Sequence, residues 1–273
     1  MRKHLSTIIL FLILILGISI LLYPTISDYW NSFHQSRAIA SYIEQIEQVD
    51  PIDYDQEWAR AIAYNQALVE KPNRFILSEE ELEEYNGILN LTGSGIMGYI
   101  DVPKIGCQLP IYHGTDDAVL QIAIGHIEGT SLPTGGLGTH TALSGHRGLP
   151  SAKLFTDLDQ MEIGDLFVMR VLNEILTYEV DQILQVLPEE LDALAIDPEQ
   201  DYCTLITCTP YGINTHRLLV RGHRVDNVEM EKIIKVTNDA KQIDPVLIAP
   251  IVAAPMLLVL FIIMMLRTRK RKI

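Results

Sequence analysis

Two long stretches of this chain lack charged residues altogether. They cover residues 5–23 and residues 245–266. A helix of about 20 apolar residues crosses the hydrocarbon core of a bilayer, so each stretch predicts a transmembrane helix. The first stretch is followed by no small-residue cleavage site, which favours an uncleaved anchor over a secretory signal. The second contains prolines, which a membrane helix tolerates better than a buried helix of a water-soluble protein.

Positive charge flanks both stretches and predicts their orientation. Arg2 and Lys3 precede the first stretch, and five Lys and Arg residues follow the second. Because cytoplasmic loops carry an excess of Lys and Arg, residues 1–4 and 267–273 are predicted to be cytoplasmic tails. The residues between the two spans, 24–244, are then extracellular. The sequence thus predicts a two-span protein of the cell membrane with its functional part outside.

Basic residues are scarce in the predicted external part. All 35 Asp and Glu residues lie there, while seven of the 21 Lys and Arg residues lie in the tails, which leaves 14 and a net charge of −21. Nucleic-acid binding relies on clustered Lys and Arg against phosphate. The charge balance therefore argues against nucleic acid as a partner.

Cysteine is also scarce, with three residues in the whole chain, Cys107, Cys203 and Cys208. The odd number leaves at least one free thiol, and secreted domains that depend on disulfides usually carry more cysteines. A free thiol outside the membrane needs another explanation, and a catalytic role is one.

Helical patterns dominate residues 24–95, which are predicted to form an extracellular helical region. Apolar spacing predicts two helices within residues 29–68, interrupted at Asp50-Pro51. Ser78 followed by three glutamates predicts a capped helix start. Residues 91–95 read as a loop, and we place a boundary near Gly95.

Short strand patterns separated by Gly, Pro and Asp fill residues 96–225. Residues 176–186 mostly alternate between apolar and polar side chains, which is the period of a half-buried strand. Further strands are predicted at residues 97–102, 141–144, 166–171, 202–207 and 217–222. So many strands in about 130 residues predict a mostly β fold, a barrel or a sandwich. Residues 226–244 read as a polar linker to the second span.

The segment TLITCTPYGINTHR, residues 204–217, is the strongest chemical signal. In a regular strand Cys203 and Cys208 point to opposite faces, and the turn signal after Cys208 places its thiol at an accessible strand end. A thiolate beside a base or a cation is a strong nucleophile, whereas a cysteine in a core is inert. We therefore predict Cys208 as a nucleophile, and Cys107 and Cys203 as core residues.

A cysteine nucleophile needs an acid or base, and several histidines compete for that role. His146 in LSGHRG directly follows an apolar strand and is flanked by glycine, so its imidazole can project into a cleft. Four other histidines lie in similar turns, so position favours His146 only weakly. The rival interpretation is a metal site of His126, His140 and His146 with a cysteine, but their spacing matches no compact zinc pattern.

Two arginines follow the cysteine loop on one predicted strand. Arg217 and Arg221 share a strand face, and hairpin pairing is expected to bring one of them beside Cys208. A guanidinium there would hold a carbonyl and stabilise the oxyanion that forms when a thiolate attacks an amide. The alternative is an ion pair with one of the many acids. We favour the functional role for Arg217 and the ion pair for Arg221.

These motifs together resemble the sortase family. The resemblance rests on TLITC, on SGHRG and on NTHRLLVRG. Together with YIDVPKI, IYHGTDDAVLQIAIGHIEGTSLPTGG and LPSAKLFTDLDQMEIGD, the sequence is similar to class C, the pilin-polymerising branch. The similarity is close over residues 96–225 and looser upstream. It implies an eight-stranded sortase-type β-barrel with N-terminal helices, and it implies no cofactor and no metal.

The resemblance also implies a role for each candidate residue. Cys208 would be the nucleophile, His146 the general acid and base, and Arg217 the group that stabilises the oxyanion and orients the substrate. Cys208 would attack the threonine carbonyl of an LPxTG-like sorting signal, and a pilin lysine would resolve the thioester in the envelope of a Gram-positive cell. Two alternatives stay open. One is a sortase that attaches surface proteins to a peptidoglycan precursor, and the other is a surface adhesin or sensor with a structural Cys208.

One departure from class C concerns the cover of the active site. Class C enzymes often carry an Asp-Pro-aromatic motif in a lid before the barrel. This chain has Lys71-Pro72-Asn73-Arg74-Phe75 in the matching region, and its nearby Asp50-Pro51 is followed by isoleucine. The departure predicts a site without a lid, or with a weak one.

Overall fold

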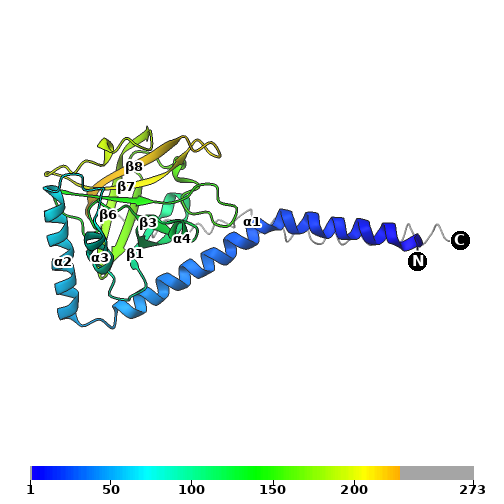
Figure 1. The fold of residues 1–273 in the computed structure, drawn as a ribbon, viewed down its shortest axis with the longest axis horizontal. Coiled ribbons are helices and arrows are strands. Elements are labelled where there is room, and N and C mark those ends of the chain that lie inside the picture. Colours follow the sequence, from blue (N-terminus) through cyan, green and yellow to red (C-terminus); the bar gives the residue numbers. More distant parts are fainter. Residues whose placement is uncertain (1, 228–273) are drawn as a thin grey trace.

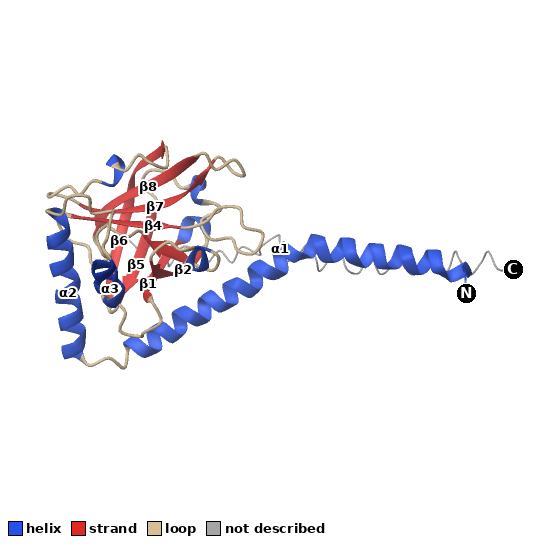
Figure 2. Ribbon diagram, in the orientation of Figure 1, coloured by secondary structure: helices blue, strands red, loops and turns tan. Residues whose placement is uncertain are grey.

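The computed structural model describes residues 2–227 of the chain. Helices come first in the sequence, and eight strands that close into a barrel follow them (Figure 1, Figure 2). The predicted second span and its cytoplasmic tail lie outside the described residues, as does nearly all of the predicted linker.

The N-terminal part of the chain is one long helix, α1 (Arg2–Ile46). The structure thus joins the predicted first span to the helical segment that the sequence predicted to begin near residue 29. Pro24 lies inside α1, and Figure 1 shows the helix bending along its length. A proline removes one backbone hydrogen bond and kinks a helix, and α1 continues through Pro24 nonetheless. By length and composition, the stretch of α1 from residue 9 onward can cross a membrane.

Two shorter helices follow where the capping signals predicted them. Helix α2 (Pro51–Val69) begins after Asp50, whose carboxylate accepts a hydrogen bond from the Ile52 amide. Helix α3 (Glu79–Gly87) begins with a complete capping box, in which Ser78 and Glu81 each bind the other's backbone N–H. Both caps satisfy amides that a helix start leaves unpaired.

The barrel has the strand order β1-β2-β3-β4-β7-β8-β6-β5. Its strands are β1 (Ile96–Val102), β2 (Cys107–His113), β3 (Ile124–His126), β4 (Thr139–Ser144), β5 (Leu166–Val171), β6 (Glu174–Val186), β7 (Asp201–Thr209) and β8 (His216–Val225). The sequence predicted six of the eight. The two missed strands have weak signals, since β2 contains Pro110, a residue that disfavours strands, and β3 is three residues long.

Two of the barrel's strand pairs are parallel, β2 with β3 and β4 with β7. The second of these pairs places the end of β4 beside the end of β7, where the candidate site lies. Fully buried side chains such as Phe155, Phe167 and Tyr178 fill the interior. A short helix, α4 (Asp117–Leu120), connects β2 to β3.

The helices are bound to the barrel by buried polar contacts. The Tyr42 hydroxyl of α1 donates to the Met97 carbonyl at 2.8 Å and accepts from the Leu172 amide at 2.8 Å. From α2, the Asn65 side chain donates to the Leu132 carbonyl and accepts from the Leu132 amide. These contacts hold α1 and α2 in fixed positions against the strands.

Candidate active site

Cys208 lies one residue before the end of β7 and is partly exposed. The antiparallel register of β7 and β8 pairs it directly with Arg217. The predicted hairpin pairing is therefore confirmed, and of the two arginines on β8 it is Arg217 that neighbours the thiol. A hairpin fixes such a pair through backbone hydrogen bonds, independently of side-chain flexibility.

His146 reaches the same place from β4. The parallel register of β4 and β7 pairs Ser144 with Ile206. Beyond the end of β4 the alignment continues, because the Gly145 amide donates to the Ile206 carbonyl at 3.0 Å. His146 follows Gly145, so the chain past the end of β4 runs toward the end of β7 that carries Cys208.

The three predicted site residues come from a row of adjacent segments, the loop after β4, then β7, then β8, in the order His146, Cys208, Arg217. Adjacent strands lie about 4.8 Å apart, so the backbones of the cross-strand partners Cys208 and Arg217 are close. A cysteine with a base on one side and a cation on the other is the arrangement that nucleophilic catalysis uses. The residues come from segments that are far apart in the sequence, and the barrel brings them together.

The guanidinium of Arg217 is not neutralised by a carboxylate within residues 2–227. Its Nη1 atom donates to the backbone carbonyls of Asn214 and His216 at 3.3 and 3.2 Å. These contacts orient the side chain and leave its remaining N–H groups available. Arg217 can therefore donate hydrogen bonds to a substrate oxygen.

Arg221, on the same strand, forms an ion pair with a carboxylate. It forms a bidentate ion pair with Asp181, with both N–O distances 2.9 Å, and its guanidinium lies 4.1 Å from the ring centre of Tyr202. The predicted ion pair for Arg221 is confirmed.

The other two cysteines are core residues, as predicted. Cys203 is fully buried and Cys107 nearly so, and all three cysteines of the chain are free thiols. Burial raises the pKa of the Cys107 thiol to about 12, and it raises the pKa of the Cys203 thiol as well. Since the reactive form is the thiolate, neither residue is a nucleophile at neutral pH.

His126 and His140 are structural residues of the barrel. The ring nitrogens of His126 contact the Tyr85 hydroxyl at 2.9 Å and the Ser131 carbonyl at 2.8 Å. Those of His140 contact the Ala195 carbonyl at 2.8 Å and the Thr204 hydroxyl at 2.7 Å. Both rings therefore have their nitrogens engaged by protein groups. In the part of the chain that the structure describes, no group of three His, Cys, Asp or Glu residues is arranged to hold a metal.

The segment with the unusual lid-like sequence lies against the same face of the barrel. Arg74 donates to the backbone carbonyls of Gly129 and Leu194 at 2.7 and 2.6 Å. Phe75 packs on an apolar cluster, which we call the groove cluster, made of Ala142, Leu194, Ile206 and Leu219. Cys208 is not a member of this cluster. The expectation of a site without a lid, or with a weak one, stays a prediction.

Two residues beside the site were not singled out from the sequence. The Thr207 hydroxyl donates to the Gly145 carbonyl at 2.7 Å, which ties β7 to the segment that carries His146. Arg147 forms an ion pair with Asp159 and lies 5.6 Å from the ring centre of Tyr211, in the β7–β8 turn. The threonine directly before Cys208 and the arginine directly after His146 are the only sequence signals for these contacts.

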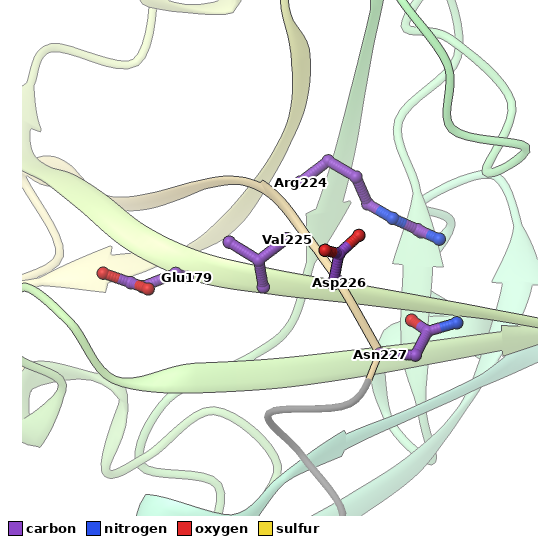
Figure 3. Close-up of a pocket in the computed structure, with 5 residues that line it drawn as sticks. All are labelled: Glu179, Arg224, Val225, Asp226 and Asn227. Atoms are coloured by element: carbon purple, nitrogen blue, oxygen red, sulfur yellow. The ribbon is translucent and has the colours of Figure 1, made fainter.

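A pocket of about 480 Å³ lies away from this row. It is lined by Glu179, Arg224, Val225, Asp226 and Asn227, which Figure 3 shows around the last residues of β8. Arg217 lies at the opposite end of that strand. This pocket is therefore separate from the candidate site.

Comparison with known proteins agrees with this geometry. A family model described as the Sortase domain matches residues 100–225. Sortase D from Bacillus subtilis (strain 168) is 28% identical over 131 residues, a match that spans 47% of this chain and 63% of that protein. The matched part is thus less than two thirds of that relative's length.

Solved structures match over nearly their whole length. The crystal structure of sortase C1 from Streptococcus agalactiae is 51% identical, with a TM-score of 0.68, and the match covers 70% of this chain and 99% of that one. Sortase C from Streptococcus pneumoniae is 41% identical, with a TM-score of 0.62, covering 70% and 97%. The fold is that of the sortases, which are cysteine transpeptidases. The chain belongs to the sortase family, and its structural neighbours include class C sortases.

Proposed function

We propose that this protein is a membrane-anchored transpeptidase that cleaves an LPxTG-like sorting signal and joins the acyl group to a pilin lysine, thereby polymerising pili. The catalytic residues are Cys208, His146 and Arg217. The barrel faces the outside of the cell, and both termini are cytoplasmic.

The row His146–Cys208–Arg217 is the observation that carries this proposal. Cys208 on β7 and Arg217 on β8 are cross-strand partners, and His146 follows the end of β4 on the other side of β7. In this proposal they act as the nucleophile, the oxyanion-stabilising cation, and the proton donor and acceptor. The neighbouring cysteine, Cys203, is buried and cannot substitute for Cys208.

The reaction proceeds in two halves. The Cys208 thiolate attacks the threonine carbonyl, and Arg217 stabilises the oxyanion of the tetrahedral intermediate. His146 gives a proton to the leaving amine as the peptide bond breaks, which leaves a thioester on Cys208. In the second half a lysine amine attacks the thioester, His146 takes its proton, and a new amide bond forms as the thiolate leaves.

In this proposal the groove cluster is the binding site for the apolar residues of the sorting signal. Ile206 shares the outward face of β7 with Cys208, and Leu219 shares that of β8 with Arg217. The four residues of the cluster are at most 6% exposed, so a bound leucine or proline would contact them only after Phe75 moved.

The likeness to class C sortases favours a pilin as substrate. The solved sortase C from S. pneumoniae is described in connection with pilin substrate specificity. This likeness favours pilus assembly over the attachment of proteins to a peptidoglycan precursor.

The first test is trapping of the thioester. The full-length enzyme in detergent is incubated with an LPxTG-like peptide, and the acyl adduct is sought by mass spectrometry. Wild type and Cys203→Ala are expected to carry the adduct, and Cys208→Ala is not. An equal signal from Cys208→Ala, or none from wild type, would show that the protein is not a cysteine transpeptidase.

A second measurement separates the two sortase roles. The enzyme is offered a pilin subunit and a peptidoglycan-precursor amine together, and the products are sequenced by mass spectrometry. A threonine-to-lysine isopeptide bond between pilins supports polymerisation. Exclusive transfer of the acyl group to the precursor would show that the enzyme attaches proteins to the cell wall and does not polymerise pilins.

A further inference from the structure

We propose that Asp28 and Asn31 of α1 are positioning residues that hold the His146-bearing loop at the outer surface of the bilayer. They set a preference for substrates tethered to the same membrane. This inference rests on the proposed function, and its partner class is a membrane-anchored substrate.

Direct hydrogen bonds join α1 to this loop. The Asp28 carboxylate accepts from the Lys153 amide at 2.6 Å, and the Asn31 side chain donates to the Ser151 carbonyl at 2.7 Å. Both contacts bind backbone atoms of the loop, so they fix the path of the chain.

The loop is closed on itself by its own hydrogen bonds, so its shape around His146 does not depend on the contacts with α1, which set only its height above the membrane. The Phe155 amide donates to the His146 carbonyl at 3.1 Å, and the Gly148 amide donates to the Thr156 hydroxyl at 3.1 Å. A β-bridge also joins Leu149 to Ala152. The residues held by α1 and the backbone of His146 therefore belong to one hydrogen-bonded unit.

The position of Asp28 along α1 places this unit at the membrane surface. The helix carries no charged residue from Leu5 to Ser27, and Asp28 is the first charged residue after this stretch. A charged side chain is costly inside the hydrocarbon core, so Asp28 lies at or beyond the boundary between that core and the headgroups. The headgroup layer on each side of a bilayer is about 5–8 Å thick. The contacts to the loop thus fall at the level of the headgroups or just outside them.

The opposite face of α1 has the character of a membrane interface. Ile26, Tyr29, Trp30 and Phe33 are each more than half exposed. At 100° per residue they cluster on one side of the helix, and Asp28 and Asn31 lie on the other. Tyr and Trp are enriched at the level of the headgroups. One side of this helical segment therefore binds the barrel, and the other suits contact with lipid.

A fixed height above the bilayer selects among substrates. A cleavage site tethered to the same membrane by a short linker stays at the level of the loop, which raises its effective concentration at Cys208. A longer linker spreads the cleavage site over a larger volume. A soluble peptide gains nothing from the fixed height.

The test compares one LPxTG-like peptide in two forms, free in solution and coupled to a lipid anchor in vesicles that also contain the full-length enzyme. The variants are Asp28→Ala, Asn31→Ala and the conservative Asp28→Asn, which keeps an acceptor oxygen. Gln35→Ala is the matched control, because Gln35 lies on the same helix face but donates to the Ile122 carbonyl, away from the His146 loop.

For the alanine variants, we expect kcat/KM on the short-linker anchored peptide to fall about tenfold, while the value on the free peptide changes less than about twofold. Asp28→Asn and Gln35→Ala are expected to stay near wild type. The preference of wild type for short linkers is expected to flatten in the alanine variants. Equal losses on both substrate forms, or no loss on either, would overturn the positioning role. A wild-type enzyme that forms no thioester on the free peptide would instead refute the proposed function.

Discussion

Cys208 on β7 and Arg217 on β8 are direct cross-strand partners, although they are nine positions apart in the chain. The hairpin that joins the two strands makes their relative position a property of the backbone. The parallel β4–β7 pair then brings the segment that leads to His146 to the other side of β7. The geometry of the Cys208–Arg217 pair therefore depends on the barrel, while His146 lies on the loop that follows β4.

Replacing the arginine tests this relationship. Arg217→Ala is expected to lower kcat by about 10²–10³, the usual loss when one oxyanion donor is removed. Arg217→Lys keeps the charge but not the planar fork, so an intermediate rate is expected. The assay is steady-state cleavage of an LPxTG-like peptide. Arg221→Ala is the control on the same strand, because its guanidinium is bound to Asp181, and a few-fold change at most is expected for it. Equal losses in both arginine variants would contradict the assignment.

Removal of the histidine tests the proton transfer. His146→Ala is expected to lower kcat by about 10²–10⁴, which is the range for a lost general acid and base. Cys208 stays in place, so alkylation with a small thiol reagent is expected to continue in the variant. His223→Ala, near the far end of β8, is expected to retain activity. Full activity of His146→Ala would exclude this residue from the mechanism.

Two buried histidines predict how stability depends on pH. Burial lowers the pKa of His126 and of His140 to about 4, below the ordinary value of 6.5. Between these values the unfolded chain binds protons that the folded barrel does not. The free energy of unfolding is therefore expected to be highest above pH 6.5 and to fall toward pH 4, by about 1.4 kcal/mol per pH unit for each histidine.

Denaturant unfolding from pH 7 to pH 4.5 checks this dependence. Glutamine can donate to the Ala195 carbonyl and accept from the Thr204 hydroxyl, as His140 does. His140→Gln is expected to show a shallower slope than wild type. Identical slopes would mean that His140 gains no proton on unfolding.

Phe75, which packs on the groove cluster, is expected to have only a small effect on the access of reagents to the Cys208 thiol. Cys208 is not a member of the groove cluster. Phe75→Ala is therefore expected to raise the rate of Cys208 alkylation by less than about threefold. Stopped-flow reaction with a bulky thiol reagent measures this rate. A rise above about tenfold would show that Phe75 shields the thiol and that the lid is a strong one.

Much of the architecture could be predicted because local signals agreed with the final fold. The break at Asp50-Pro51 and the capping pattern at Ser78 placed two helix starts, and period-two alternation placed β6. Helix caps and period-two alternation depend on hydrogen bonds and burial within a few residues of one another, so they can be recognised in the sequence. Where the local signal conflicted with tertiary context, prediction failed. Strand β2 contains a proline, and α1 continues through one.

The sequence by itself determined the chemical types in the site. It placed Cys208 at a strand end, separated it in phase from Cys203, and offered Arg217 on the next strand. It could not single out His146 firmly, because five histidines lie in similar turns and spacing along the chain says little about distance in space. The parallel β4–β7 register, which joins segments about 60 residues apart, brings the segment before His146 beside the strand of Cys208, whereas the ring nitrogens of His126 and His140 form hydrogen bonds inside the barrel. Tertiary structure also decided that α1 binds the His146 loop, since a contact between Asp28 and Lys153 depends on how a helix docks on a barrel and leaves no pattern in the sequence.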